Sequence, residues 1–360
     1  MSSVLKVGIV GATGAVGQRF VALLLGEGGN CSAGRWALVA VGASSRSCGA
    51  TYAAATNWVL ETPMPAAVRD MVVVDCSADA MSACDVVFSA LDASVAGDVE
   101  LALASAGLLV FSNAKNYRME RDVPILLPLV NAPHLALLRH QRRVRGWTTG
   151  GIVCNANCST TGLATALAPL AARFGLERVQ VVTLQAISGA GYPGVAALDI
   201  TANVLPFISG EEEKMAIESN KILGSLTAAG DSIEFASFGV SATCTRVPVV
   251  DGHMLCVTVQ LTREARSLDE VLSAWNEHAT PPGLASAPQH AIQVLDGPHP
   301  QPRRDVLRGN GYTVSIGRVR LDRFGLHFVS LVHNTILGAA GGSILNAELA
   351  IRDGFVNVKK

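Results

Sequence analysis

The chain has 360 residues, enough at roughly 150 residues per domain for two domains. Its 28 basic and 29 acidic residues nearly cancel, so it lacks the basic surplus typical of nucleic-acid-binding proteins, and no nucleic acid partner is expected. Hydrophobic residues make up 49% and charged residues 16%, which excludes a disordered chain. No apolar run reaches the roughly 18 residues of a membrane helix, so no membrane association is expected either.

No targeting signal is expected at either end of the sequence. Residues 1–6 lack the basic and apolar regions of a secretory signal, and Val358-Lys359-Lys360 is not a peroxisomal address. The eight cysteines are scattered, which is typical of reduced thiols rather than of a disulfide framework. Cys154 and Cys158 have no second Cys/His pair at zinc spacing, so no metal site is expected. We expect a cytoplasmic protein.

Strand and helix patterns alternate in the first half of the chain. A β-branched apolar run at residues 4–10 precedes helical spacing of apolar residues over 16–25. Shorter apolar runs predict further strands at residues 38–41, 71–74, 86–89 and 108–111. A helix is expected around residues 99–106. This alternation predicts a parallel, doubly wound sheet and therefore the α/β class.

The second half has a different pattern. A helix is expected at 161–174 and a long strand at 179–187. Apolar and polar residues then alternate in three runs, at 255–261, 312–319 and 324–332, which predicts an antiparallel sheet covered on one face. A last helix, 341–352, is expected to return to the first sheet. We therefore expect a Rossmann-type dinucleotide-binding domain (1–157 and 338–360) and an α+β domain (158–337).

A glycine-rich loop lies between the first strand and the first helix. Its spacing, G-x-x-G-x-x-G over residues 11–17, is a variant of the dinucleotide fingerprint. Glycines here permit a tight turn, let backbone N–H groups approach a pyrophosphate and aim a helix N-terminus at its charge. We predict that the cofactor contacts include Gly11, Thr13, Gly14, Ala15 and Val16.

The end of the second strand indicates which dinucleotide is bound. NAD-binding sites usually carry an acidic residue here for the ribose 2′-hydroxyl. This sequence has Ser44, Ser45 and Arg46 instead, which favours a 2′-phosphate and hence NADP. The alternative is that Arg46 is only a solvated loop charge.

Cys158 differs from the other seven cysteines, which are expected to be small core residues. It lies where a strand runs into an alanine- and leucine-rich helix. The unpaired N–H groups of a helix N-terminus favour a thiolate, and with Asn157 they could hold an oxyanion. A thiol beside a nicotinamide site predicts acyl transfer, in which a thioester forms and a hydride reduces it to an aldehyde.

Five segments of the chain form a recognisable set: SNAKNYRM from Ser112, NANCST from Asn155, QAISGAG from Gln185, GEEEK from Gly210 and RVPVVDGH from Arg246. In these segments the chain resembles the aspartate-semialdehyde dehydrogenases, within the wider group of acyl-phosphate reductases that includes glyceraldehyde-3-phosphate dehydrogenase. The resemblance extends over nearly the whole length and is greatest to the archaeal and fungal branch. It implies a catalytic and dimerisation domain of the glyceraldehyde-3-phosphate dehydrogenase type and a homodimer or homotetramer.

The resemblance also implies the catalytic roles. Cys158 would be the nucleophile, and His253 the acid/base that takes the thiol proton and later serves the tetrahedral intermediates. His253 follows Asp251-Gly252 at the start of a strand, where an imidazole can meet substrate. Gln185 would orient the substrate near the thiol. Arg246 would bind the substrate α-carboxylate through its planar fork, the alternative being an interdomain salt bridge.

The remaining site residues follow from the same resemblance. Glu211 and Lys214 would contact the substrate amine and phosphate, although the run Glu211–Glu213 leaves the register open and an acidic cluster is usually a solvated helix start. Arg118 would bind phosphate, and Asn113 would lie near substrate and phosphate. Further cofactor contacts are implied for Ser188, Gly189, Asn334 and the turn at 338–342.

The implied reaction is reduction of L-aspartyl 4-phosphate by NADPH to L-aspartate 4-semialdehyde and phosphate, a step toward lysine, threonine and methionine. A malonyl-CoA or succinyl-CoA reductase would use the same cysteine and histidine and stays an alternative. N-acetyl-glutamyl-phosphate reductase acts on a blocked amine, so an amine-binding Glu211 argues against it. The complete set of Cys158, Gln185, Arg246 and His253 argues against a silent NADP-binding sensor.

Overall fold

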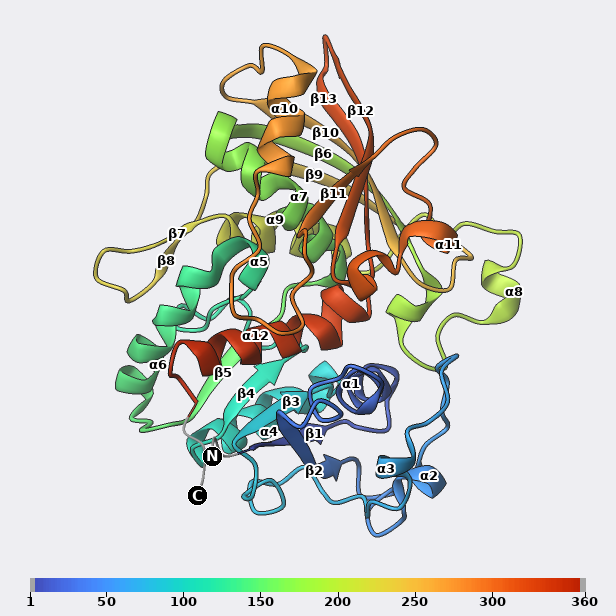
Figure 1. Cartoon of the computed structure of the whole chain (residues 1–360), viewed down its shortest axis with the longest axis vertical. Coiled ribbons are helices and arrows are strands. Elements are labelled where there is room, and N and C mark those ends of the chain that lie inside the picture. Colours follow the sequence, from blue (N-terminus) through green and yellow to red (C-terminus); the bar gives the residue numbers. More distant parts are fainter. Residues whose placement is uncertain (1–3, 357–360) are drawn as a thin grey trace.

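The computed structural model of the chain describes residues 4–356, built around two sheets with helix α12 (Gly341–Arg352) between them (Figure 1). Residues 1–3 and 357–360 lie outside the described residues, and with them half of the N-terminal segment and all of the C-terminal segment on which the targeting expectation rests. Within residues 4–356, no helix is both long enough and apolar enough to span a bilayer.

The first sheet is parallel and five-stranded, with the order β2-β1-β3-β4-β5. Its strands are β1 (Leu5–Val10), β2 (Trp36–Gly42), β3 (Val86–Ser89), β4 (Leu109–Ser112) and β5 (Gly151–Cys154). The helices of this part are α1 (Ala15–Leu25), α2 (Tyr52–Ala55), α3 (Ala66–Arg69), α4 (Ala93–Ser105), α5 (Pro128–Asn131), η1 (Ala132–Ala136) and α6 (Leu137–Arg145). Because β1 lies between β2 and β3, the winding reverses at β1, and doubly wound sheets bind ligands at the carboxyl ends of the strands there.

The strand expected at residues 71–74 does not form, and that prediction is wrong. Only isolated bridges join Gly42 to Val74 and Thr51 to Val72. Val73 exchanges hydrogen bonds with residues 49 and 50 of the loop that follows β2, whereas Val74 bonds to residues 41 and 43 at the end of that strand. Because the loop takes the backbone bonds of Val73, only a single bridge to β2 forms and the segment does not become a strand.

The second sheet has six strands in the order β11-β12-β13-β10-β6-β9. They are β6 (Leu176–Gln185), β9 (Gly239–Arg246), β10 (His253–Leu261), β11 (Ile292–Leu295), β12 (Val314–Asp322) and β13 (Gly325–Val332), and β7 (Ser225–Leu226) pairs separately with β8 (Ile233–Glu234). The central strands are antiparallel as expected, but β9 and β11 join in parallel. The three strands predicted from alternating residues thus pair antiparallel, and the parallel addition of β9 and β11, which was not predicted, makes the sheet mixed.

Helices cover one face of this sheet and reach the first sheet. They and the remaining helices are α7 (Cys158–Phe174), η2 (Ile187–Ala190), α8 (Ala197–Ile200), α9 (Glu211–Ile222), α10 (Leu268–Asn276), α11 (Pro302–Asp305), η3 (Arg308–Gly311) and the π-helical turn η4 (Ile336–Ala340). The side chain of Trp275 on α10 is buried edge-on against Phe328 of β13, with ring centroids 5.2 Å apart.

Helix α12 returns to the first sheet, as expected, and runs across the molecule between the two halves in Figure 1. Its side chains are buried almost throughout, and its polar residues are hydrogen-bonded. Asn113 donates to Ser343 Oγ at 3.2 Å, and Asn346 donates to Asn155 Oδ1 at 2.6 Å. These bonds join α12 to the ends of β4 and β5, beside the site described next. The exact domain boundaries stay a prediction.

Candidate active site

The glycine-rich loop lies at the carboxyl end of β1, as predicted. Gly11 has φ +77°, and a β-carbon there would lie 2.6 Å from the carbonyl oxygen of Ala90. Gly14 is the N-cap of α1, so it has no side chain between the helix N-terminus and a ligand. The loop therefore fits a dinucleotide pyrophosphate, which needs close approach to backbone N–H groups.

Two further regions match the predicted ends of the cofactor. Ser44 and Arg46 follow β2 and are exposed, so both side chains can approach a 2′-phosphate. On the other side, Asn334 donates to Ser188 Oγ at 2.8 Å and accepts from the N–H of Gly252 at 2.8 Å. A cavity of about 1040 Å³ is lined there by Ala15 and Ser188, among others. The predicted residues thus lie in two regions, one at the end of β2 and one beside the N-terminus of α1.

Cys158 is the first residue of α7, three residues earlier than the predicted start of that helix. Asn157 is the N-cap, and its side-chain oxygen accepts from the N–H groups of Ser159 and Thr160. Burial and the Glu211 carboxylate raise the pKa of the Cys158 thiol to about 12, although Arg118 and Arg246 act in the opposite direction. Desolvation therefore outweighs the effect of the helix N-terminus, which was expected from the sequence to favour a thiolate.

His253 begins β10 and is fully buried. Its Nδ1 accepts a hydrogen bond from the N–H of Ala186 at 3.0 Å, and within residues 4–356 no group bonds to its buried Nε2. An accepting Nδ1 places the hydrogen of the neutral imidazole on Nε2. Burial and the positive charge of Arg246 lower the pKa of His253 to about 3. The resting histidine is thus a neutral donor.

Gly189, in the turn η2, packs against two of the predicted site residues, His253 and Arg246. A β-carbon on Gly189 would lie 3.0 Å from His253 Nε2 and 2.9 Å from Arg246 Nη1. Arg246 ends β9, is buried, and donates from Nη1 to the carbonyl oxygen of Ala186 at 2.8 Å. Near the thiol, a β-carbon on Gly338 would lie 2.9 Å from Cys158 Cβ. Glycine at these two points lets the backbone pack directly against His253, Arg246 and Cys158, where a side chain would clash.

Glu211 is a buried centre of hydrogen bonding, not a solvated helix start. Its Oε2 accepts from Asn157 Nδ2 at 2.8 Å and from Gln185 Nε2 at 3.4 Å, and its Oε1 accepts from Lys214 Nζ at 2.8 Å. Burial alone would raise the pKa of Glu211, but the bonds from Lys214, Asn157 and Gln185 hold it below its ordinary value. The sequence left open which glutamate of residues 211–213 faces inward. In the structure Glu211 is buried and Glu213 is exposed.

Arg118 and Asn113 lie next to each other, as predicted, but are already occupied. Arg118 donates from Nη2 to the carbonyl oxygen of Asn113 at 3.0 Å and from Nη1 to Glu218 Oε1 at 2.9 Å. The Asn113 side chain donates to the carbonyl oxygen of Ser89 at 2.9 Å and accepts from Asn155 at 2.9 Å. Arg118 can still present its remaining edge to an anion, whereas the Asn113 side chain is engaged within the protein.

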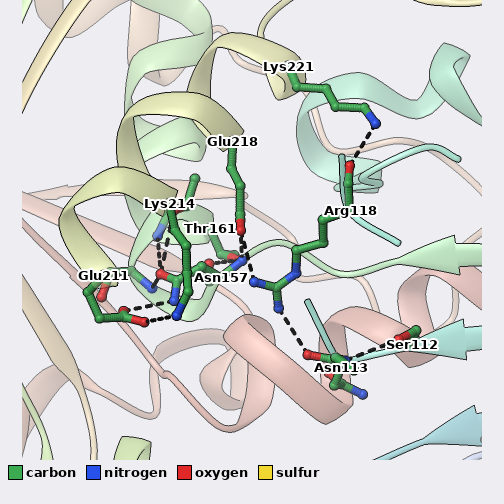
Figure 2. A network of polar contacts seen from close by, with 12 residues as sticks. Ser112, Asn113, Arg118, Asn157, Thr161, Glu211, Lys214, Glu218 and Lys221 are labelled. Carbon is green, nitrogen blue, oxygen red and sulfur yellow. Dashed lines mark hydrogen bonds and ion pairs between the residues drawn. The ribbon is translucent and has the colours of Figure 1, made fainter. Parts of the chain in front are cut away.

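Two residues of the site were missed by the sequence reasoning, Glu218 and Lys221. Figure 2 shows them on the same helix as Glu211 and Lys214, facing Arg118 and Asn157. The spacing 211, 214, 218 and 221 follows the i, i+3, i+7, i+10 pattern of one helix face. That pattern of alternating acidic and basic residues was the signal that could have found them.

Comparisons with known proteins agree over the whole chain. A family described as "Semialdehyde dehydrogenase, NAD binding domain" matches residues 6–138, and "Semialdehyde dehydrogenase, dimerisation domain" matches residues 167–337. The chain is similar to an aspartate-semialdehyde dehydrogenase of Cryptococcus neoformans (50% identity over 364 residues, 98% of each chain). It is also similar to one of Archaeoglobus fulgidus (44% over 351 residues, 97% of this chain and 98% of the other).

Solved structures give the same result. The structure of the Candida albicans aspartate semialdehyde dehydrogenase with NADP is similar with a TM-score of 0.89 and 43% identity, covering 98% of this chain and all of that one (100%). The Vibrio cholerae aspartate semialdehyde dehydrogenase II, solved with ASA, has a TM-score of 0.75 at 24% identity and covers 98% of this chain and 99% of that one. The second likeness concerns the fold alone.

Proposed function

Because the chain belongs to the aspartate-semialdehyde dehydrogenase family, we propose that the residues gathered around Cys158 form its active site. The chain is an enzyme that reduces L-aspartyl 4-phosphate to L-aspartate 4-semialdehyde and phosphate with NADPH, in the biosynthesis of the aspartate family of amino acids. The observation that carries the site assignment is the position of Cys158, at the N-terminus of α7 beside the polar residues of α9.

NADP is the cofactor, and this chain offers a fitting cradle for it. Residues 11–16 would receive the pyrophosphate, Ser44 and Arg46 the 2′-phosphate, and Ser188, Gly189 and Asn334 the nicotinamide end. When bound, the cofactor supplies the hydride that reduces the acyl group. The glycines keep side chains out of the space that the cofactor needs.

The protein groups then perform acyl transfer. Cys158, whose pKa of about 12 keeps the thiol protonated at rest, attacks the acyl carbon and loses its proton as the carbon–sulfur bond forms. The bond between the acyl carbon and the phosphate oxygen breaks, and the departing phosphate carries the thiol proton away as hydrogen phosphate. Arg118 and Arg246 favour the thiolate electrostatically. The Nε2–H of His253 is available to the oxygen of the tetrahedral intermediate, where a donor is most valuable. Proton acceptance by His253 would require its imidazole to release the bond from Ala186.

The ends of the substrate have separate partners. The planar fork of Arg246 suits the α-carboxylate, and the ionised Glu211 suits the amine. Lys214 and Arg118 supply positive charge for the phosphate, one on each side of Asn157 (Figure 2). Gln185, bonded to Glu211, would orient the substrate beside the thiol.

The amine-binding Glu211 also distinguishes aspartyl phosphate from the acyl-CoA alternative, because malonyl-CoA and succinyl-CoA carry no amine at that position. The test is a substrate panel read by NADPH consumption. We expect turnover of aspartyl phosphate and none above background with malonyl-CoA or succinyl-CoA; the reverse order would reject the proposal.

Replacing Arg246 with lysine is expected to lower kcat/KM for the semialdehyde about ten- to a hundredfold. Lysine keeps the charge but loses the bidentate fork, and a charge-assisted hydrogen bond contributes about 1.5–3 kcal/mol, at about 1.4 kcal/mol per decade. Steady-state kinetics in the oxidative direction measure the effect. Arg178, on β6, provides the control as Arg178→Lys, and an unchanged kcat/KM in Arg246→Lys would remove Arg246 from the site.

The cofactor loop gives a second expected result. NADP should be preferred over NAD by roughly ten- to a hundredfold, because Ser44, Ser45 and Arg46 donate to a phosphate and no carboxylate repels it. Because Arg46 is exposed, solvent and ions screen its charge. The preference should therefore lie near tenfold if the loop stays open when the cofactor is bound. The measurement is kcat/KM with each cofactor for wild type and Arg46→Ala. Equal values in wild type would show that this loop does not read the phosphate, and a preference unmoved by Arg46→Ala would assign it to the serines.

The chain is expected to work as a homo-oligomer, since the matched catalytic part is that of a dimerisation domain. A homodimer or homotetramer is our proposal, supported by the exposed Val182 and Cys256 on the outer face of the six-stranded sheet. A cytoplasmic location is likewise proposed, supported by the scattered cysteines.

A further inference from the structure

Two residues of α9 connect the phosphate-binding arginine to the nucleophile. We propose that Glu218 and Lys221 are positioning residues that hold Arg118 in a fixed place relative to the peptide that precedes Cys158. This inference rests on the proposed function, since it concerns how the phosphate of that substrate is held.

The Glu218 carboxylate is shared between two partners. Its Oε1 accepts from Arg118 Nη1 at 2.9 Å, and its Oε2 accepts from the backbone N–H of Asn157 at 2.7 Å (Figure 2). Asn157 is the N-cap whose peptide leads directly into Cys158. One rigid carboxylate therefore sets the separation between the guanidinium and the start of the nucleophile's helix.

Lys221 holds the main chain of the same arginine. It is buried, and its Nζ donates to the carbonyl oxygens of Arg118 at 2.7 Å, Glu120 at 2.8 Å and Val123 at 2.8 Å. These bonds use all three protons of an ammonium group. The loop that carries Arg118 is thus attached to α9 one turn beyond Glu218.

The two contacts together have a functional meaning. From a single helix, Glu218 fixes the side chain of Arg118 and Lys221 fixes its backbone, while the same helix contributes Glu211 and Lys214. The residues proposed to bind phosphate are therefore fixed in position relative to the nucleophile Cys158. Because acyl transfer depends on the reacting groups being aligned, a shift of about 1 Å costs up to about a hundredfold in rate.

The test variant is Glu218→Gln, which keeps the volume but has only one acceptor oxygen for two donors. The assay is phosphate-dependent oxidation of the semialdehyde with NADP, in which the KM for phosphate and the KM for the semialdehyde are measured separately. We expect kcat/KM for phosphate to fall about ten- to a hundredfold, while KM for the semialdehyde changes less than about twofold. Glu218→Asp, whose shorter carboxylate still accepts two bonds, should recover part of the loss.

Two controls accompany the measurement. Glu213→Gln changes an exposed carboxylate on the same helix and should leave both KM values at wild type. Thermal unfolding of Glu218→Gln reports whether it folds, and Lys221→Arg, which keeps the charge but cannot reproduce three ammonium bonds, gives a second variant with the same expected split.

The outcomes separate the two proposals. If wild type shows no phosphate-dependent NADPH formation, the proposed function fails. If wild type is active and a folded Glu218→Gln keeps its KM for phosphate, or binds phosphate more tightly because a competing carboxylate has gone, the positioning role is overturned. An equal loss of affinity for both substrates would also overturn it, since that indicates a general structural role.

Discussion

Replacing Cys158 with alanine is expected to lower semialdehyde oxidation at least about a thousandfold, which corresponds to more than about 4 kcal/mol of barrier. Without the thiol no thioester can form, and the route that divides the reaction into two easier steps is lost. NADP binding should survive, because the glycine-rich loop and residues 44–46 lie on the first sheet. Steady-state kinetics and titration of NADP by calorimetry measure the two quantities.

The control for this variant is Cys154→Ala. Cys154 ends β5 four residues before Cys158, is fully buried and hydrogen-bonds through its backbone to residues 124 and 126. It should keep its activity within the range that a modest loss of stability allows. If Cys158→Ala stays within tenfold of wild type, Cys158 is not the nucleophile.

The helix N-terminus at Cys158 could be predicted from the sequence, whereas the protonation of its thiol could not. A strand that runs into an alanine-rich helix identifies a helix N-terminus, because both patterns are local. The pKa of the thiol depends on burial and on Glu211, Arg118 and Arg246, which come from three other parts of the chain. Desolvation is a property of the packed structure, so no local pattern could have predicted it.

The same distinction explains the strands. The first sheet has fully buried strands such as β3, at 86–89, and apolar runs locate them well. The run at 71–74 is apolar too, but a loop takes its backbone bonds, and Val72 is exposed. Pairing direction is also non-local, so the parallel addition of β9 and β11 was not foreseen.

Glu218 and Lys221 show a further limit. The resemblance implied only residues that contact substrate or cofactor, whereas Glu218 and Lys221 bind other groups of the protein. Their partners lie about a hundred residues or sixty residues away in sequence, so only the folded structure reveals what they hold. The helical spacing that marks them was visible, but its meaning depended on Arg118.

His253 is the residue whose predicted role the geometry refines most. Its Nδ1 is occupied by the N–H of Ala186, so a proton on Nδ1 would oppose that N–H. Arg246, next to it across Gly189, opposes a positive charge as well. A nearby histidine, His333, also contributes to lowering the pKa of His253 to about 3. Burial and these two neighbours therefore favour the neutral form of His253 in the free enzyme.

Replacing His253 with alanine is accordingly expected to lower kcat about 10²- to 10⁴-fold, and His253→Gln should lose less, because its amide can still donate where Nε2–H does. The wild-type profile of kcat/KM against pH should have no acid limb near 6.5, the ordinary value for histidine, since protonation occurs only as pH falls toward about 3. Initial rates from pH 5 to 9 with both variants measure this, and thermal unfolding checks that they fold. An acid limb near 6.5 that disappears in His253→Gln would show instead that His253 titrates there and works as a base, which would reject the donor role.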